Sequence, residues 1–285
     1  MKTIQSLLGG LGSMALAATA TAQFNVFTDD FSSPTSNINT AGYYAAGNFG
    51  GGADLNVAGS NLNIVYGSSS GGLVNISRAF PAQTIAVGQQ IRLDFNLSTI
   101  GSVSAVQRGI RFSLGYIDPA NQLMADSPLR SPIAVPTGFT GYMGAISTNP
   151  GALTSIGFLN GTGNVIHVEG AAANGNTGGS LSWLVDSTTQ NLDQSFASLD
   201  GVLLITRTVD GYDTLVTIGG VSLQQSHVGG PAAFNTFGFG INGGQAPGTG
   251  FSFDSVSVTV IPEPTTYAAI FGLLGLAWVV WRRRR

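Results

Sequence analysis

Apolar and polar residues that alternate at a spacing of two are the feature that most restricts how this chain can fold. In residues 91–97, Ile91, Leu93, Phe95 and Leu97 alternate with charged or amide side chains, and residues 110–116 repeat the pattern. A period of two places one face of a strand on an apolar core and the other in water. Similar short runs occur at 62–66, 73–80, 154–160, 164–169, 181–185, 202–209, 213–218, 234–241 and 251–260. This spacing predicts an all-β fold, an antiparallel β-sandwich or jelly roll.

Turn residues between these runs support the same fold. Asp210-Gly211 separates two predicted strands and predicts a hairpin with a type I′ turn, whose two central residues need positive φ. Asn160-Gly161 predicts a second hairpin. Within 251–260 the apolar phase slips by one residue, which predicts a β-bulge near Asp254-Ser255. Only residues 186–201 read as a helix, and a short one.

The composition indicates how the core is stabilised and excludes one class of partner. The 285 residues include 41 glycines and no cysteine, with 9% charged and 43% hydrophobic residues. The core must therefore fold without disulfides. Residues 23–261 contain six arginines, no lysine and thirteen acidic side chains, so their net charge is −7. Nucleic acid is excluded as a partner because a basic surface for phosphates is missing.

The N-terminus predicts export. Residues 1–22 have the parts of a signal peptide: one cation at Lys2, an apolar stretch over 7–18, and small residues Ala20 and Ala22 before the cleavage point. The apolar stretch is too short to cross a bilayer as a helix. We therefore expect an ectodomain over residues 23–260 that begins at Gln23 once the signal peptide is removed.

The C-terminus predicts a membrane helix. Residues 265–281 are seventeen uncharged residues, at the lower limit for crossing a bilayer. Pro262 and Pro264 cannot supply the N–H groups of a helix interior, so a transmembrane helix over 265–281 is expected to start after them. The arginine tail, 282–285, is expected to stay cytoplasmic with the ectodomain outside. A plain C-terminal anchor would have the same properties.

The order of these C-terminal parts resembles the PEP-CTERM sorting signal. Its residues are a Pro-Glu-Pro before the apolar helix and a terminal arginine cluster: Pro262, Glu263, Pro264, Arg282, Arg283, Arg284 and Arg285. The Gly-Leu-Leu-Gly-Leu-Ala stretch, 272–277, is also typical of that family. The resemblance covers only residues 261–285 and implies nothing about an ectodomain activity.

The PEP-CTERM resemblance implies a route for the chain. Secretion machinery would export it across the inner membrane of a Gram-negative envelope, where the C-terminal helix anchors it transiently. An exosortase, an integral-membrane cysteine transpeptidase-like enzyme, would then process it. The product would reach the cell surface or the extracellular space, often alongside exopolysaccharide.

The ectodomain resembles concanavalin-like jelly rolls in its opening strand, 24–31, its closing strand, 251–260, and its hairpin, 205–220. Retaining glucanases of that fold carry a Glu-x-Asp-x-x-Glu strand pattern, which this chain lacks, and Glu169 is the only glutamate in residues 23–260. No spacing selects a carboxylate pair for glycoside hydrolysis. The chain is therefore predicted to be a non-enzymatic structural or adhesive surface protein. A carbohydrate-binding module is the alternative, and a glycan hydrolase the third.

Six polar residues are candidates for chemistry. His167 and Glu169 lie two apart, so a strand would place them on one face, where a surface polar pair is favoured over a metal or acid–base role. His227 falls in a predicted loop. Jelly rolls of this type often bind Ca²⁺ where the first and last strands meet, near Asp29 and Asp254.

Asp30 lies near the same two strands, and its carboxylate is also an oxygen ligand of the kind that Ca²⁺ binds. Solvated carboxylates are the favoured interpretation of all three acids. No metal or cofactor is assigned.

Two aromatic residues complete the set of candidates. Tyr43 and Tyr44 could stack on a sugar. Packing of these side chains in the core or in a loop is the favoured interpretation.

Overall fold

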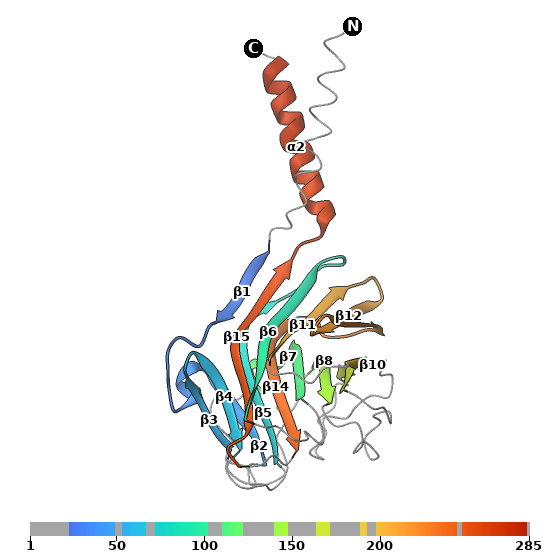
Figure 1. Cartoon of the computed structure of the whole chain (residues 1–285). Coiled ribbons are helices and arrows are strands. Elements are labelled where there is room, and N and C mark those ends of the chain that lie inside the picture. Colours follow the sequence, from blue (N-terminus) through green and yellow to red (C-terminus); the bar gives the residue numbers. More distant parts are fainter. Residues whose placement is uncertain are drawn as a thin grey trace.

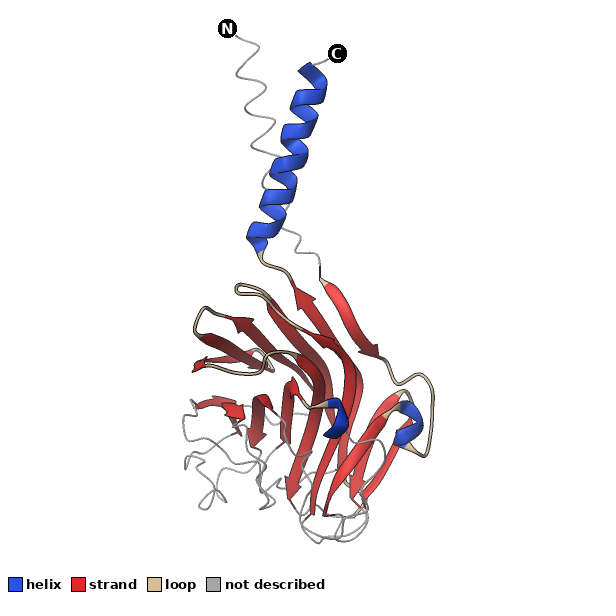
Figure 2. Ribbon diagram, turned by 180° about the vertical axis from the view of Figure 1, so that it is seen from behind, coloured by secondary structure: helices blue, strands red, loops and turns tan. Residues whose placement is uncertain are grey.

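Two antiparallel sheets packed face to face make up the body of the protein. The computed structural model describes residues 23–48, 53–66, 72–101, 110–121, 140–147, 164–171, 189–192, 198–243 and 247–283. A C-terminal helix, α2, leaves one end of the sandwich (Figure 1). Seen from behind, strands make up nearly all of the regular structure below that helix (Figure 2). The predicted all-β antiparallel sandwich is confirmed; the expected strands at 154–160 and 181–185 and the Asn160-Gly161 turn lie outside the described residues.

Within the described residues the first sheet has eight strands. The strand order is β13 (Val221–Val228), β12 (Gly211–Ile218), β11 (Ser198–Arg207), β6 (Gln90–Ile100), β15 (Gly250–Ile261), β4 (Asn61–Tyr66) and β3 (Ala53–Ala58). The eighth strand, β1 (Phe24–Asp29), also pairs with β15. Residues 250–253 of β15 pair with β4 and residues 256–260 pair with β1, so these two strands share one edge. The register shifts between Phe253 and Ser255, which confirms the predicted bulge.

The second sheet has seven strands within the described part of the chain. Their order is β10 (Thr189–Leu192), β9 (Asn164–Ala171), β8 (Thr140–Ser147), β7 (Ile110–Tyr116), β14 (Phe234–Gly243), β5 (Gly72–Gln83) and β2 (Tyr43–Asn48). Two short 3-10 turns, η1 (Ile38–Ala41) and η2 (Pro119–Asn121), lie in the connections. Beyond β7, the Asn235 amide accepts from the Ile117 N–H and donates to its carbonyl, at 2.9 and 2.7 Å, which prolongs the pairing with β14.

The predicted helix over 186–201 is wrong. Residues 189–192 form β10 and pair with β9, and residues 198–201 begin β11 and pair with β6. Residues 186–188 and 193–197 lie outside the described residues, so the correction applies to 189–192 and 198–201. Thr, Asn and Ser have weak helix propensity, and pairing with two existing sheets outweighs it.

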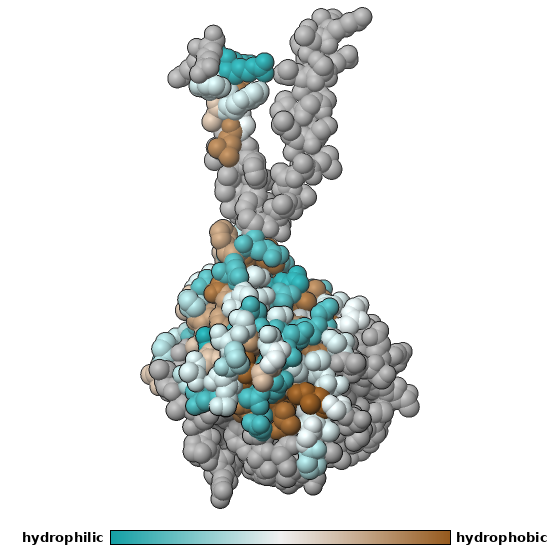
Figure 3. Space-filling view, turned by 60° about the vertical axis from the view of Figure 1, so that its left-hand side comes forward, coloured by the Kyte–Doolittle hydropathy of each residue, from teal (hydrophilic) through white to brown (hydrophobic). Residues whose placement is uncertain are grey.

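Helix α2 (Pro264–Arg283) stands clear of the sandwich, with apolar side chains exposed along it and hydrophilic atoms beyond them (Figure 3). Four of the exposed side chains are Leu274, Leu276, Trp278 and Trp281. The helix therefore extends the molecule in one direction from one end of the sandwich.

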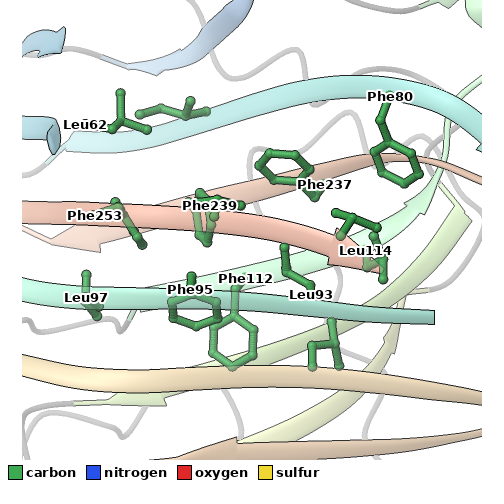
Figure 4. Close-up of a cluster of buried hydrophobic side chains, with 14 of the residues drawn as sticks. Leu62, Phe80, Leu93, Phe95, Leu97, Phe112, Leu114, Phe237, Phe239 and Phe253 are labelled. Atoms are coloured by element: carbon green, nitrogen blue, oxygen red, sulfur yellow. The ribbon is translucent and has the colours of Figure 1, made fainter. Parts of the chain in front are cut away.

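Aromatic side chains from both sheets fill the space between them (Figure 4). Phe95 of the first sheet lies with its ring centroid 4.8 Å from Phe112 and 5.4 Å from Phe239, both of the second sheet. Phe239 in turn lies 4.2 Å from Phe253 of the first sheet. Such tilted and edge-on pairs contribute packing energy beyond the buried area. The core therefore stabilises the sandwich without disulfides.

Two glycines make room for these rings. Gly201 is paired with Phe95 on β6, and Gly144 with Phe112 on β7. A Cβ on Gly201 would collide with the Phe95 ring, and one on Gly144 would collide with the Phe112 ring. Neither glycine has a positive φ. Both are therefore required by space and not by backbone conformation.

We expect Gly201→Ala to lower the free energy of unfolding by about 1–3 kcal/mol, because the added methyl overpacks the Phe95 ring. Gly272→Ala is the matched control, since a Cβ there meets no atom within 4 Å. Chemical denaturation of both variants measures the difference. An equal or larger loss in Gly272→Ala would contradict the packing argument.

The hairpin at 205–220 is confirmed, but its turn is not type I′. Strands β11 and β12 pair from Gly201 with Ile218 to Arg207 with Tyr212. Neither Asp210 nor Gly211 has a positive φ. A longer connection is closed instead by the Thr208 N–H, which donates to the Gly211 carbonyl at 2.9 Å.

Candidate functional site

One end of the sandwich carries the start of α2, and we call it the helix end. It is formed by the β5–β6 loop (84–89), the β11–β12 loop (208–210), the end of β13, the start of β1 and residues 261–263. Backbone hydrogen bonds join these segments: the Gly88 N–H donates to Arg207 and the Gly229 N–H donates to Asp210. The last residue of β15, Ile261, pairs with Gln90 at the start of β6.

The Pro-Glu-Pro segment lies on this end. Pro262 is buried, and the Glu263 side chain is half-buried. A Cβ on Gly88, which has a φ of +84°, would collide with the Glu263 carboxyl carbon, so the glutamate lies directly over the β5–β6 loop. Pro262 and Glu263 have no regular secondary structure, in keeping with their predicted place before the helix.

The bounds of α2 differ from the predicted 265–281. The helix begins at Pro264, since the first position of a helix has no need of an N–H donor. It ends at Arg283, and Arg282 stacks on the Trp278 ring at 5.3 Å. Arg284 and Arg285 lie outside the described residues.

The predicted transmembrane helix is not supported. Among the described residues, no helix combines the length and the apolar character that crossing a membrane requires. The uncharged stretch, 265–281, is already at the lower limit of a bilayer span. Its first two residues, Thr265 and Thr266, are polar, and Arg282 and Arg283 follow it. Signal-peptide residues Ala20 and Ala22 lie outside the described residues.

The three candidate calcium ligands have separate roles in the structure. Asp29 accepts hydrogen bonds from the Phe31 N–H at 2.8 Å and the Tyr43 hydroxyl at 3.0 Å. Hydrogen bonds from the Ser32 side chain and backbone lower the pKa of Asp30 below its ordinary value. Asp254 is exposed at the bulge of β15, two residues from the partner of Asp29. Within the described part of the chain, no group of three or more His, Asp or Glu side chains could hold a metal ion.

Tyr43 is a core residue with 0% exposure, so the packing interpretation of this residue is confirmed. Its hydroxyl donates to Asp29, and the Arg78 guanidinium lies 5.1 Å from its ring. Arg78 is also 5.2 Å from the Phe27 ring, on the opposite sheet. Sequence alone did not place an arginine between the sheets. Tyr44, the next residue, is half-exposed on the outer face of β2.

His227 lies in strand β13 and not in the predicted loop. Its Nε2 atom is 2.9 Å from the Thr214 hydroxyl, and its ring lies 4.8 Å from that of Tyr142. Tyr142 belongs to the second sheet and also packs 5.4 Å from Tyr212 of the first. Its hydroxyl donates to the Gly229 carbonyl at 3.0 Å. These residues close the space between the sheets near the helix end, a structural role that the sequence did not reveal.

Alkaline pH should destabilise the protein through its buried tyrosines. Burial raises the pKa of Tyr43, Tyr142 and Tyr212 above the ordinary value for tyrosine. Their neutral forms stabilise the fold fully below the unfolded pKa of about 10, and this contribution is lost as pH rises above it, when only the unfolded chain ionises.

Denaturation between pH 8 and 11, roughly the range that brackets the tyrosine pKa, measures this effect. Tyr43→Phe should show a weaker fall in stability than the parent chain. A Tyr44→Phe control should match the parent, because Tyr44 is half-exposed. Equal slopes for all three proteins would contradict the prediction.

His167 and Glu169 lie on β9, opposite Ala145 and Met143 of β8. The alternation of a strand places both on one face, as predicted. Their side chains lie outside what the structure describes. No role is assigned to them.

A row of amide and hydroxyl side chains crosses the outer face of the first sheet. Asn56, Asn63, Ser252, Ser98 and Ser198 pair directly across β3, β4, β15, β6 and β11. Asn63 donates to Asn56 at 3.2 Å, and the Ser252 hydroxyl donates to Asn63 at 2.9 Å. Ser252 is buried, at 4% exposure, whereas the other four are half-exposed or exposed and can also hydrogen-bond to an outside polar ligand. The row was not apparent in the sequence because its members are far apart in the chain.

Comparison with solved structures identifies the fold. Lectin II from Ulex europaeus matches with a TM-score of 0.51 and 14% identity, over 85% of this chain and 99% of the lectin. The lectin UEA-II complexed with galactose gives the same TM-score at 12% identity, over 85% and 99% of the two chains. An endo-1,3-beta-glucanase from Streptomyces sioyaensis gives a TM-score of 0.45 at 13% identity, over 86% and 98%. No family model and no curated protein matches the chain.

The class of the protein follows from the two lectin matches and the two-sheet topology. The chain has the concanavalin-like jelly-roll fold, as the sequence resemblance predicted. At 12 and 14% identity, these matches establish the fold alone.

Proposed function

We propose that this chain is an exported protein of the cell surface or extracellular matrix, with a structural or adhesive role and no catalytic activity. Residues 1–22 would direct export, and residues 261–285 would form a tail that an exosortase removes. Exopolysaccharide is the proposed partner of the released sandwich.

The position of the Pro-Glu-Pro carries this proposal. Strand β15 ends at Ile261, and the helix with its arginines begins at Pro264. Cleavage between these two elements would therefore take no strand from either sheet. A tail that can be removed without damage to the core is what a processing signal requires.

The test is the mass of the mature protein. The full chain would be expressed in a Gram-negative host with an exosortase and in a matched host without it, and its mass would be measured after isolation. We expect loss of the C-terminal tail only in the first host. The same full-length tail in both hosts would contradict processing.

Carbohydrate binding is a second candidate function, supported by the fold shared with lectins that include a galactose complex. Two separate surfaces could contribute: the Asn and Ser row on the outer face of the first sheet offers hydrogen-bonding groups, and half-exposed Tyr44 on the outer face of the second sheet offers an aromatic face. Retention on immobilised galactose and on a glycan array measures binding. Tyr44→Ala should reduce retention if Tyr44 stacks on the sugar, whereas release of reducing sugar would instead favour a hydrolase.

A further inference from the structure

The described sandwich exposes four large apolar side chains, which we call the apolar rim. They are Phe24, Val87, Val209 and Val228, with exposed fractions of 60, 51, 80 and 94%. They come from four segments that are distant in the sequence: the start of β1, the β5–β6 loop, the β11–β12 loop and the end of β13. A single exposed apolar residue is ordinary. These four are spread across one end of the first sheet, from β1 at one edge to β13 at the other, so together they suit an extended apolar surface and not a small ligand.

All four residues lie at the helix end. Phe24 pairs with Val260, close to the end of β15. The loop of Val87 hydrogen-bonds to Arg207, beside the loop of Val209. Val228 pairs with Gly211, immediately after that loop. At the other end of the sandwich, the described turn residues Gly101, Pro247 and Gly248 are small or cyclic and carry no large apolar side chain.

The apolar rim and α2 face the same surroundings. The helix leaves the same end (Figure 1) and exposes Leu276, Trp278 and Val280. Tryptophan and arginine together are typical of lipid interfaces. A surface that receives the apolar part of α2 would meet the apolar rim at the base of the helix.

We propose that the apolar rim rests on a lipid bilayer while the tail is still attached. This inference rests on the proposed sorting function, in which the tail would meet an integral-membrane exosortase; it requires α2 to contact lipid and does not require it to cross the bilayer. Exposed Asp210 and half-buried Glu263 lie at this end together with Arg207, and two acids with one arginine give these residues no net positive charge. The attraction of the rim to lipid is therefore apolar, whereas the arginines of the tail supply the attraction to anionic headgroups.

A cysteine-free chain allows this contact to be measured with single labels. Full-length Val228→Cys and Asp54→Cys would each carry a polarity-sensitive thiol dye and be mixed with phosphatidylcholine vesicles that contain a minority of phosphatidylglycerol. Asp54 is an exposed control that pairs near Val65, away from the helix end. In a Trp183→Phe background, tryptophan fluorescence comes from Trp278 and Trp281 alone and reports separately whether the tail has entered the lipid.

We expect a blue shift and protection from an aqueous quencher for the Val228 label only. A tail that enters the vesicles while the Val228 label stays as water-exposed as the Asp54 label would overturn the rim and leave the sorting proposal standing. If neither the tail nor the rim contacts lipid, both proposals fail. Protection that requires host membranes with the exosortase, and that lipid vesicles do not give, would identify a protein partner and overturn the lipid assignment.

A pair of charge substitutions supplies a second measurement. Val209→Asp with Val228→Asp should reduce vesicle partition of the full chain by about tenfold, because two apolar side chains no longer leave water. Ser222→Asp with Gln224→Asp adds the same charge to exposed positions of β13 outside the rim and should change partition much less. Equal losses in both double variants would show a general charge effect and would overturn the proposal.

Discussion

Phe95→Ala is expected to lower the free energy of unfolding by about 3–5 kcal/mol. Phe95 is 4% exposed and contacts rings of both sheets, with Phe112 at 4.8 Å and Phe253 at 6.1 Å between centroids. Its removal leaves a cavity at the centre of the core, opposite Gly201, which has no side chain to fill it. Chemical denaturation measures the change.

Phe24→Ala is the matched control for that experiment. It deletes the same side chain at a position that is 60% exposed, so stability should change by about 0.5 kcal/mol or less. Comparable losses in the two variants would show that the Phe95 effect is not caused by the cavity between the sheets.

Pro262→Ala combined with Glu263→Ala should abolish removal of the tail in a host that has an exosortase. The proposed exosortase would recognise these two residues, whereas Pro264, the first residue of α2, is unchanged in the double variant. The full-length precursor should accumulate, which mass spectrometry of the isolated protein measures. An anchor that is not processed would be indifferent to both changes.

The control for this experiment is Pro247→Ala, a proline change in an exposed turn at the opposite end. It should be processed like the parent chain. Normal mature mass in the double variant would remove the sorting-signal hypothesis, and failure of both variants would indicate a general defect of export or folding.

The alternating pattern predicted the central strands well because burial imposes it. Leu93, Phe95 and Leu97 of β6 are buried as expected, and the phase slip near Asp254 corresponds to the observed bulge. Prediction failed where partners distant in the sequence decide the structure. Residues 189–192 form a strand because β9 lies beside them, and no local signal reveals that neighbour.

The candidate sites were less predictable than the fold for the same reason. Asp29 is engaged by Tyr43 and the Phe31 N–H, and His227 lies within a strand against Tyr142, a contact between the two sheets. The apolar rim gathers residues from four segments, each of which looks like an ordinary valine or phenylalanine by itself. The Pro-Glu-Pro stands out in the sequence because its residues are consecutive, and its role as a sorting signal stays a prediction.

The placement of β15 has a mechanical consequence. Its outgoing end is Ile261, and it is bonded along its length to β6 and, on its other edge, to β4 and then β1. Antiparallel hydrogen bonds run perpendicular to the strands, so tension applied at the C-terminus along β15 would load these bonds together in shear. They would not open one at a time, as they do when a strand is peeled from an edge. A sandwich attached to a surface through Ile261 would therefore resist a pulling force applied along β15.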